Sequence, residues 1–216
     1  MKRAAGAITG AAALAFAAPA QAADERLELW LNPTVVVELD DKNFVELETA
    51  QRFRGDGADD TYFFRGWIGR EIADDVDVSV GIERRFEGNG RETRLLQQIG
   101  YPIVGPLEGR SRMEQRFIEG QPQTGWRFRQ RLGGNVPLSD KDNGWELTAN
   151  VEGFFTLRGS NPTAQTGLTA YRAFVGVEKE FGNLELTIGY QRAHQIRDNA
   201  RDIAGNAPFI GLELEL

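Results

Sequence analysis

The sequence predicts an all-β protein: an antiparallel up-and-down transmembrane β-barrel of about 10–12 strands. Three observations support this: segments of alternating apolar and polar residues, dense charge on the polar face of that alternation, and an N-terminal export signal. In residues 76–83, four aliphatic side chains alternate with Asp77, Ser79, Gly81 and Glu83. Because a strand directs successive side chains to opposite faces, such a segment builds a sheet with one apolar and one charged surface.

Residues 1–22 are predicted to be a signal peptide. Lys2 and Arg3 precede an Ala-rich apolar core that ends in Ala20-Gln21-Ala22, which is the pattern of a cleavable secretory leader. A retained anchor helix is the alternative, but the apolar core is short for a membrane span. Removing the leader leaves residues 23–216 as a single β-barrel domain, and its net charge moves from −7 to −9 because two basic groups are lost.

Composition excludes several classes of function. The acidic balance argues against nucleic acid as a partner, which requires a basic surface. The chain has no cysteine and one histidine, so disulfides, thiolate chemistry and a transition-metal site are not expected, and no cofactor is predicted. After the leader no segment approaches twenty apolar residues. A closed barrel is therefore the only predicted way to cross a bilayer.

Eleven strands are predicted, separated by turns rich in Gly, Asp and Asn. Their ranges are 27–39, 43–54, 61–73, 76–87, 92–103, 109–119, 125–136, 145–157, 168–181, 184–196 and 208–216. Segments 55–60, 158–167 and 197–207 are predicted to be longer loops. Bacterial outer-membrane barrels have an even number of strands. We therefore expect ten or twelve, with the first segment least secure because it contains Pro33.

A soluble barrel of the lipocalin kind would show the same alternation with its apolar face inside. Aromatic residues near strand ends favour membrane interfaces instead. They are Tyr62-Phe63-Phe64, Phe86, Tyr101, Trp126, Trp145, Phe181 and Tyr190. Arginine outnumbers lysine 21 to 4. Arginine suits crowded ion-pair networks better than lysine, so the charged face is predicted to line a narrow aqueous lumen.

The C-terminal segment resembles the insertion signal of outer-membrane barrels. Gly211 is followed by Leu214 and Leu216 at alternating apolar positions, although Leu216 stands where an aromatic residue is usual and Phe209 where a polar residue is usual. The predicted partners are therefore outer-membrane lipid and the outer-membrane assembly machinery, which this strand would contact.

Gln97, Gln115 and Gln130 fall on the side of three consecutive strands that would face lipid. An amide that faces hydrocarbon without a partner costs a few kcal/mol, on the order of 2–7. These glutamines must therefore bond to one another, contact a second barrel, or lie on a wall that does not face lipid. An oligomer is one expectation, in which case replacing all three with Leu would change migration on a native gel.

A family resemblance combines these features. The leader, Trp30, the strand Glu46-x-Glu48-x-x-x-Arg52-x-Arg54 and the terminus inside a strand resemble the domain-of-unknown-function 2490 family of outer-membrane β-barrel-like proteins. The resemblance implies a barrel in the cell outer membrane of a Gram-negative bacterium. It implies no reaction and no functional residues.

The charge distribution predicts which residues line the lumen. Arginines lie on the middle strands and glutamates, including Glu28, Glu38 and Glu215, on strands near the two ends, so an arginine wall would face a glutamate wall in a closed meander. The candidate lumen-lining residues are Arg110, Arg112, Arg116, Arg127, Arg129, Arg131, Glu46, Glu48, Glu185 and Glu213. The expected function is a narrow porin-like channel or solute-binding barrel for a small polar or anionic solute. The alternative is a plugged structural or interaction barrel.

An enzyme is not expected, and no catalytic or metal residue is assigned. His194 is the single histidine, no serine lies near it in sequence, and it is predicted to be exposed at a strand end rather than to act as a base in a lipid-modifying barrel enzyme. Asp56, Asp59 and Asp60 lack the regular spacing of a Ca²⁺ loop and are expected to be solvated.

Overall fold

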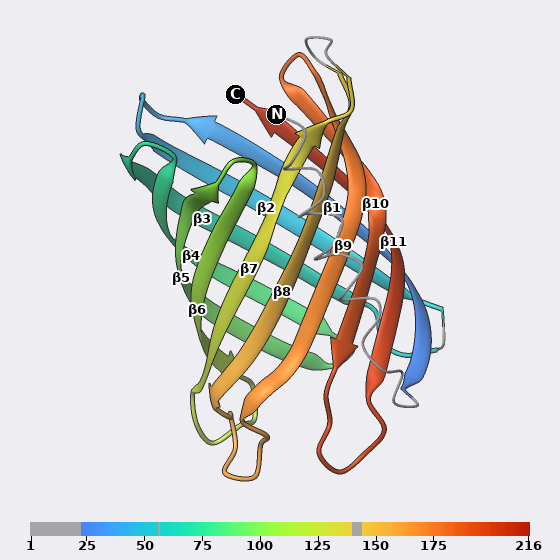
Figure 1. The fold of residues 1–216 in the computed structure, drawn as a ribbon. Helices are drawn as coiled ribbons and strands as arrows, with labels where there is room; N and C mark the ends of the chain where they lie inside the picture. Colours follow the sequence, from blue (N-terminus) through green and yellow to red (C-terminus); the bar gives the residue numbers. More distant parts are fainter. Residues whose placement is uncertain (1–22, 56, 140–143) are drawn as a thin grey trace.

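The computed structural model describes residues 23–55, 57–139 and 144–216, and the predicted signal peptide lies outside this part of the chain. The described residues form one closed barrel of eleven strands (Figure 1). The strands are β1 (Asp24–Glu38), β2 (Asn43–Arg54), β3 (Thr61–Ala73), β4 (Val76–Glu87), β5 (Gly90–Val104), β6 (Leu107–Ile118), β7 (Gly125–Pro137), β8 (Glu146–Arg158), β9 (Gly167–Phe181), β10 (Leu184–Gln195) and β11 (Ile203–Glu215). The predicted fold class is confirmed, and each predicted strand corresponds to one observed strand.

The expectation of ten or twelve strands is wrong. All neighbouring strands pair antiparallel except β1 and β11, which close the barrel as a parallel pair running from Asp24 beside Ile203 to Val36 beside Glu215. A parallel closing pair is what permits an odd strand number. Pro33 does not interrupt β1: it is paired with Leu212 of β11, while the pairing with β2 skips from Leu31 to Thr34.

The connections at the two ends of the barrel differ in length. At one end, here called the short-turn end, lie the connections 39–42, 74–75, 105–106 and 182–183, together with the last residues of β7 and β11 and the first residue of β8 (Figure 1). At the other, the long-loop end, lie 55–60, 88–89, 119–124, 159–166, 196–202 and the first residue of β1. In two of the tight turns the chain adopts positive φ at Asp75 and Gly88, as two-residue hairpin turns require.

The loop predicted at 197–207 is too long. β11 begins at Ile203, where Ala204 and Gly205 pair with β10 on one side and β1 on the other, and Ala207 pairs with β10. Small residues carry no alternation of hydrophobicity, so this part of the strand looks like a loop in the sequence.

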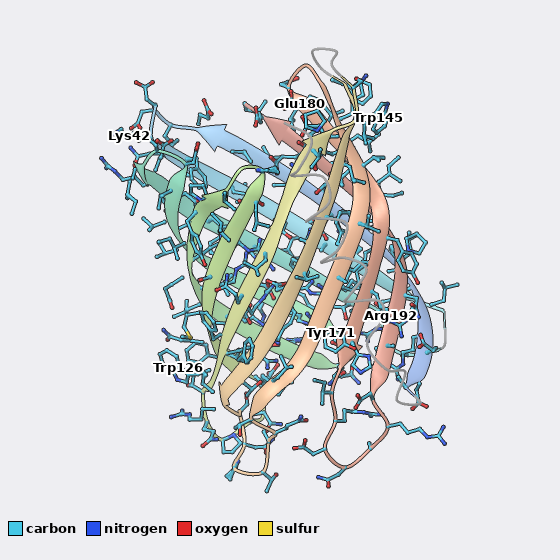
Figure 2. The ribbon with its side chains drawn as sticks, in the orientation of Figure 1. Lys42, Trp126, Trp145, Tyr171, Glu180 and Arg192 are labelled. Atoms are coloured by element: carbon cyan, nitrogen blue, oxygen red, sulfur yellow. The ribbon has the colours of Figure 1, made fainter. Side chains whose placement is uncertain are left out.

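The outer face of the barrel is apolar, with aromatic residues near both ends. Tyr62, Phe64 and Phe181 are among the exposed large apolar side chains, and Trp126 and Trp145 lie at opposite ends of the barrel (Figure 2). Phe63 departs from the aromatic prediction, because alternation directs it inward, where it is only 3% exposed. The described residues include no helix that is long and apolar enough to cross a membrane.

The three glutamines of the outer face have different surroundings. Gln130 is satisfied within its own barrel: Ser111 Oγ donates to its Oε1 at 2.6 Å, and its Nε2 donates to Tyr101 Oη at 3.1 Å. Gln97 is exposed and Gln115 half-buried. No hydrogen bond joins the three to one another within the described residues, so a contact with a second barrel at Gln97 and Gln115 stays a prediction.

Candidate functional site: the charged interior of the barrel

The inward faces of the strands enclose a cavity of about 950 Å³. All ten residues predicted from the sequence to line the lumen do line this cavity. Its lining extends from Glu185 and Glu213 near the short-turn end to Ile196 and Arg197 at the long-loop end. The cavity therefore has contact with both ends of the barrel.

A ring of alternating charges crosses the interior. We call it the ionic belt, and it takes one residue from each of the strands β2 to β9: Glu48, Arg65, Glu83, Arg94, Glu114, Arg129, Glu152 and Arg172. Every neighbouring pair in this series lies within ion-pair distance. The charges alternate in sign from strand to strand, so each inner member has an opposite charge on either side.

The belt follows the sheet register over its first half. Glu48, Arg65, Glu83 and Arg94 are direct partners across three strand pairs, with Arg65 Nη2 2.5 Å from Glu83 and Arg94 Nη1 3.0 Å from the same carboxylate. From Arg94 to Glu152 the belt moves diagonally, since the direct partner of Arg94 is Arg116 rather than Glu114, whereas Glu152 and Arg172 are again direct partners. The strands of a closed barrel are tilted, so a ring at constant height must step from one register row to the next.

The belt is almost fully buried. Glu114 is 0% exposed, Glu83 1%, and Arg94 and Arg129 are each 4% exposed. Burying a charge is unfavourable unless it is paired and hydrogen-bonded. Arg129 meets this requirement by placing Nη1 2.7 Å from Glu114 and Nη2 2.7 Å from Glu152. The belt is therefore a buried series of charges that neutralise one another.

Trp30 lies in the sector of the barrel where the ionic belt has no charged member. Strands β10, β11 and β1 contribute no residue to the ionic belt, but the guanidiniums of Arg172 and Arg52 lie 5.7 and 3.9 Å from the centroid of the Trp30 ring. The indole Nε1 donates a hydrogen bond of 2.6 Å to Glu28. Cation–π contacts thus join the two sides of this uncharged sector.

Four glutamates lie on the short-turn side of the belt; Glu46, Glu185 and Glu213 belong to the predicted glutamate wall, and Glu178 does not. Glu46, Glu178, Glu185 and Glu213 all line the cavity from β2, β9, β10 and β11, which are neighbours through β1. Arg110, Arg112 and Arg131 line it from β6 and β7, on the far side of the strand order. Glu38 and Glu215, at the ends of β1 and β11, are exposed.

The arginine wall takes its carboxylate partners from strands next to or two away from its own, not from the glutamate wall. Arg116 Nε lies 2.5 Å from Glu92, Arg127 Nη2 2.5 Å from Glu114, and Arg110 Nη2 3.1 Å from Glu152. Sequence reasoning missed Arg65, Glu83, Glu92, Arg94, Glu152 and Arg172 as site residues. The signal that could have found Glu83 and Arg94 is the Gly88-Asn89 turn, which sets them opposite each other.

His194 is not exposed as predicted. Its Nε2 lies 2.8 Å from Asp202 Oδ2, its ring stacks on Tyr171 at 4.7 Å, and its side chain is 11% exposed. The hydrogen bond from His194 and a backbone N–H from Arg197 lower the pKa of Asp202 below its usual value. The contact ties loop 196–202 to β10, and no serine hydrogen-bonds to His194 in the described part of the chain.

The acidic loop groups do not form a cation site in the described residues. Asp56 lies outside them, and Asp60 Oδ1 accepts the backbone N–H of Arg54 at 2.8 Å. No group of three potential metal ligands occurs in residues 23–55, 57–139 and 144–216.

Comparisons with known proteins agree with this architecture. The model of a family described as "Protein of unknown function (DUF2490)" matches residues 27–204. No curated protein matches the sequence. Among solved structures the barrel is similar to a NanC porin in a rhombohedral crystal form, with a TM-score of 0.58 and 10% sequence identity over 88% of this chain and 98% of the porin chain. At this low sequence identity, the structural similarity shows a shared porin-like fold and does not extend to function.

Proposed function

The chain belongs to the DUF2490 family, whose description assigns no activity, and we propose that it is an outer-membrane barrel that admits small polar solutes, anions preferentially, to a narrow charged lumen. The observation that carries the proposal is the cavity of about 950 Å³, lined by charged side chains from strands around the barrel. A charged pore of this kind selects solutes by its bore and by the sign of its lining groups.

The outer surface supports the membrane location. Its apolar side chains and terminal aromatics suit a hydrocarbon layer between two interfaces. We place the long-loop end at the cell exterior and the short-turn end at the periplasm, because bacterial barrels carry their longer loops outside. Heat-modifiable migration of the protein extracted from outer membranes tests the membrane location. A protein found only in the soluble periplasmic fraction would contradict it.

The C-terminal strand is the proposed contact with the assembly machinery. Leu212 on β11 and Leu216, the residue directly after this strand, are exposed. β11 is paired on both sides in the finished barrel. Replacing both with Ser would then lower the amount of protein in the outer membrane, while refolding of the purified chain in detergent would change little. Equal losses in both assays would assign these residues to stability alone.

Planar-bilayer conductance is the direct test of solute passage. The wild-type barrel should show small channel steps, because the ionic belt narrows the lumen. Replacing Glu83 and Arg94 together with Ser should increase the step size, since this removes a buried, charge-neutral part of the belt. The neighbouring ions keep partners, because Arg65 retains Glu48 and Glu92 retains Arg116.

The control removes a more exposed Arg–Glu ion pair that lies outside the cavity. Arg192 Nη2 lies 2.8 Å from Glu25, and neither residue lines the cavity. The Glu25→Ser/Arg192→Ser variant should conduct like the wild type. A conductance change as large as that of the belt variant would mean that loss of stability, not bore width, is being measured.

The second candidate is a plugged structural barrel, and the burial of the belt favours it. Its signature would be a wild-type protein without channel steps at any voltage and a Glu83→Ser/Arg94→Ser variant that conducts. Neither candidate is an enzyme. A change in lipid A after deletion of the gene would instead indicate a lipid-modifying enzyme.

A further inference from the structure

Four arginines form a square on two adjoining strands. In the antiparallel pairing of β6 with β7, Arg110 lies opposite Arg131 and Arg112 lies opposite Arg129. All four side chains line the cavity. Like charges placed directly opposite each other destabilise a strand pair. This arginine square therefore needs negative charge from other parts of the barrel.

Three of the four arginines obtain that charge from carboxylates. Arg129 contacts Glu114 and Glu152 at 2.7 Å each, Arg110 lies 3.1 Å from Glu152, and Arg131 lies 3.8 Å from Glu108. Arg112 is the exception. Within the described residues, no carboxylate oxygen lies within 4 Å of its guanidinium nitrogens.

The amide of Gln98 occupies the place of the missing carboxylate. Arg112 Nε and Nη2 both donate to Gln98 Oε1, at 2.9 and 2.5 Å, and the guanidinium lies 4.7 Å from the centroid of the Trp67 ring. These contacts hold the side chain in place but supply no formal negative charge. Arg112 is only 3% exposed, and a buried cation without a counter-ion is strongly unfavourable.

An unused donor lies next to it. Within residues 23–55, 57–139 and 144–216, Arg110 Nε is buried and has no hydrogen-bond partner, although Arg110 Nη2 bonds to Glu152. Arg110 and Arg112 are two residues apart on one face of β6, so their side chains are neighbours. The arginine square thus combines an unmatched positive charge with a hydrogen-bond donor that no protein atom accepts.

We propose that the arginine square binds the oxyanion group of a solute, a carboxylate or a phosphate, with Arg112 as the principal ligand. A planar guanidinium binds either group through two parallel N–H donors. The inference rests on the proposed function in that the solute must enter the lumen, but binding does not require passage through the belt.

Two variants of opposite design test the site. Gln98→Glu keeps the shape of the side chain and gives Arg112 an internal carboxylate, whereas Arg112→Gln removes the cation. In both variants the arginine square should no longer need an external anion to balance its charge. Arg84→Gln is the control, because Arg84 bonds to Thr93 Oγ1 at 2.6 Å and does not line the cavity.

The measurement is the thermal unfolding midpoint of the purified full barrel in detergent. Inorganic phosphate and acetate are titrated separately at constant ionic strength set with chloride. A bound anion stabilises the folded state by RT times the logarithm of one plus the ratio of its concentration to its dissociation constant. For the wild type and Arg84→Gln we expect a rise that follows this logarithm with at least one of the two probes. In Gln98→Glu and Arg112→Gln the apparent affinity should fall at least about tenfold.

Each outcome has a defined meaning. A rise with acetate alone indicates a carboxylate solute, and a rise with phosphate alone indicates a phosphorylated one. In chloride, Gln98→Glu should unfold at a higher temperature than the wild type, which shows that the variant folds. No response of the wild type to either probe, or equal responses in all four proteins, would overturn the site.

This experiment separates the inference from the proposed function. A barrel that gives no channel steps but loses its anion response in Gln98→Glu has the site without the passage. A barrel that conducts and responds identically in all variants has the passage without the site.

Discussion

The guanidinium of Arg172 on β9 lies 5.7 Å from the ring centroid of Trp30 on β1, although β10 and β11 stand between these strands in the sheet. The contact crosses the sector in which the ionic belt has no charged member. Arg52 approaches the same ring from β2 at 3.9 Å. Trp30 therefore links Arg172, the β9 end of the ionic belt, to Arg52, an arginine of β2 that lies outside the belt.

Replacing Trp30 with Leu should destabilise the barrel by roughly 2–4 kcal/mol, because the ring is 4% exposed and both cation–π contacts are lost. The measurement is the urea midpoint of the barrel refolded in detergent. Trp145, 38% exposed, supplies the control, and Trp145→Leu should change stability much less. Equal effects of the two replacements would show that Trp30 has no special role.

Glu114→Gln should cost about 3–5 kcal/mol, the usual range for breaking a buried ion pair from one side. Glu114 is 0% exposed and is the carboxylate nearest to Arg127, at 2.5 Å, so its loss leaves a buried cation. The readout is the temperature at which heat-modifiable migration is lost. As a control, Glu119→Gln changes an exposed loop residue of the same type and should behave like the wild type. A Glu114→Gln barrel as stable as the wild type would mean that water or an ion replaces the carboxylate.

Gly81→Ala should destabilise the barrel by about 1–3 kcal/mol through overpacking. A Cβ at Gly81 would lie 2.5 Å from Cε3 of Trp67 and 2.7 Å from the carbonyl oxygen of Gly66, so the indole that supports Arg112 would have to move. Gly66→Ala is the matched control, since its nearest contact would be an ordinary 3.6 Å. Near-ultraviolet circular dichroism of both variants reports displacement of the ring. A spectrum of Gly81→Ala identical to that of Gly66→Ala would contradict this packing.

The contact of Asp202 with His194 predicts that loop 196–202 loosens in acid. Hydrogen bonds from His194 and from the Arg197 N–H lower the pKa of Asp202 in the folded protein. Because this pKa is lower in the folded protein, the ionised carboxylate stabilises the loop at pH values above the unfolded pKa of about 4. That stabilisation is lost as the pH falls through the pKa of the folded protein. Hydrogen exchange of the Arg197 amide, which donates to Asp202 Oδ1 at 2.9 Å, should therefore show strong protection at pH 7 and weak protection near pH 3. Asp202→Asn should abolish that difference, and protection in Asp202→Asn with the same pH dependence would assign the effect elsewhere.

Part of the charged interior can be derived from local sequence. Glu83 and Arg94 flank the Gly88-Asn89 turn at equal distances, and a two-residue turn sets the register of the hairpin, so their pairing follows from position alone. The same reasoning does not give the contact of Arg94 with Glu114 at 3.9 Å. That contact is diagonal and depends on the strand tilt, which only closure of the barrel sets.

The sequence by itself determined the strands, their inward charged faces and the turns that join neighbours, because these depend on the two-residue period of a β-strand and on local turn chemistry. Only the tertiary structure decided the odd strand number, since the parallel pairing of β1 with β11 joins segments almost 180 residues apart. The tertiary structure also decided which groups the inward-facing charged side chains contact. Closure places Arg172 and Arg52 on one tryptophan and leaves Arg112 beside an amide, and neither relationship is encoded within a single hairpin.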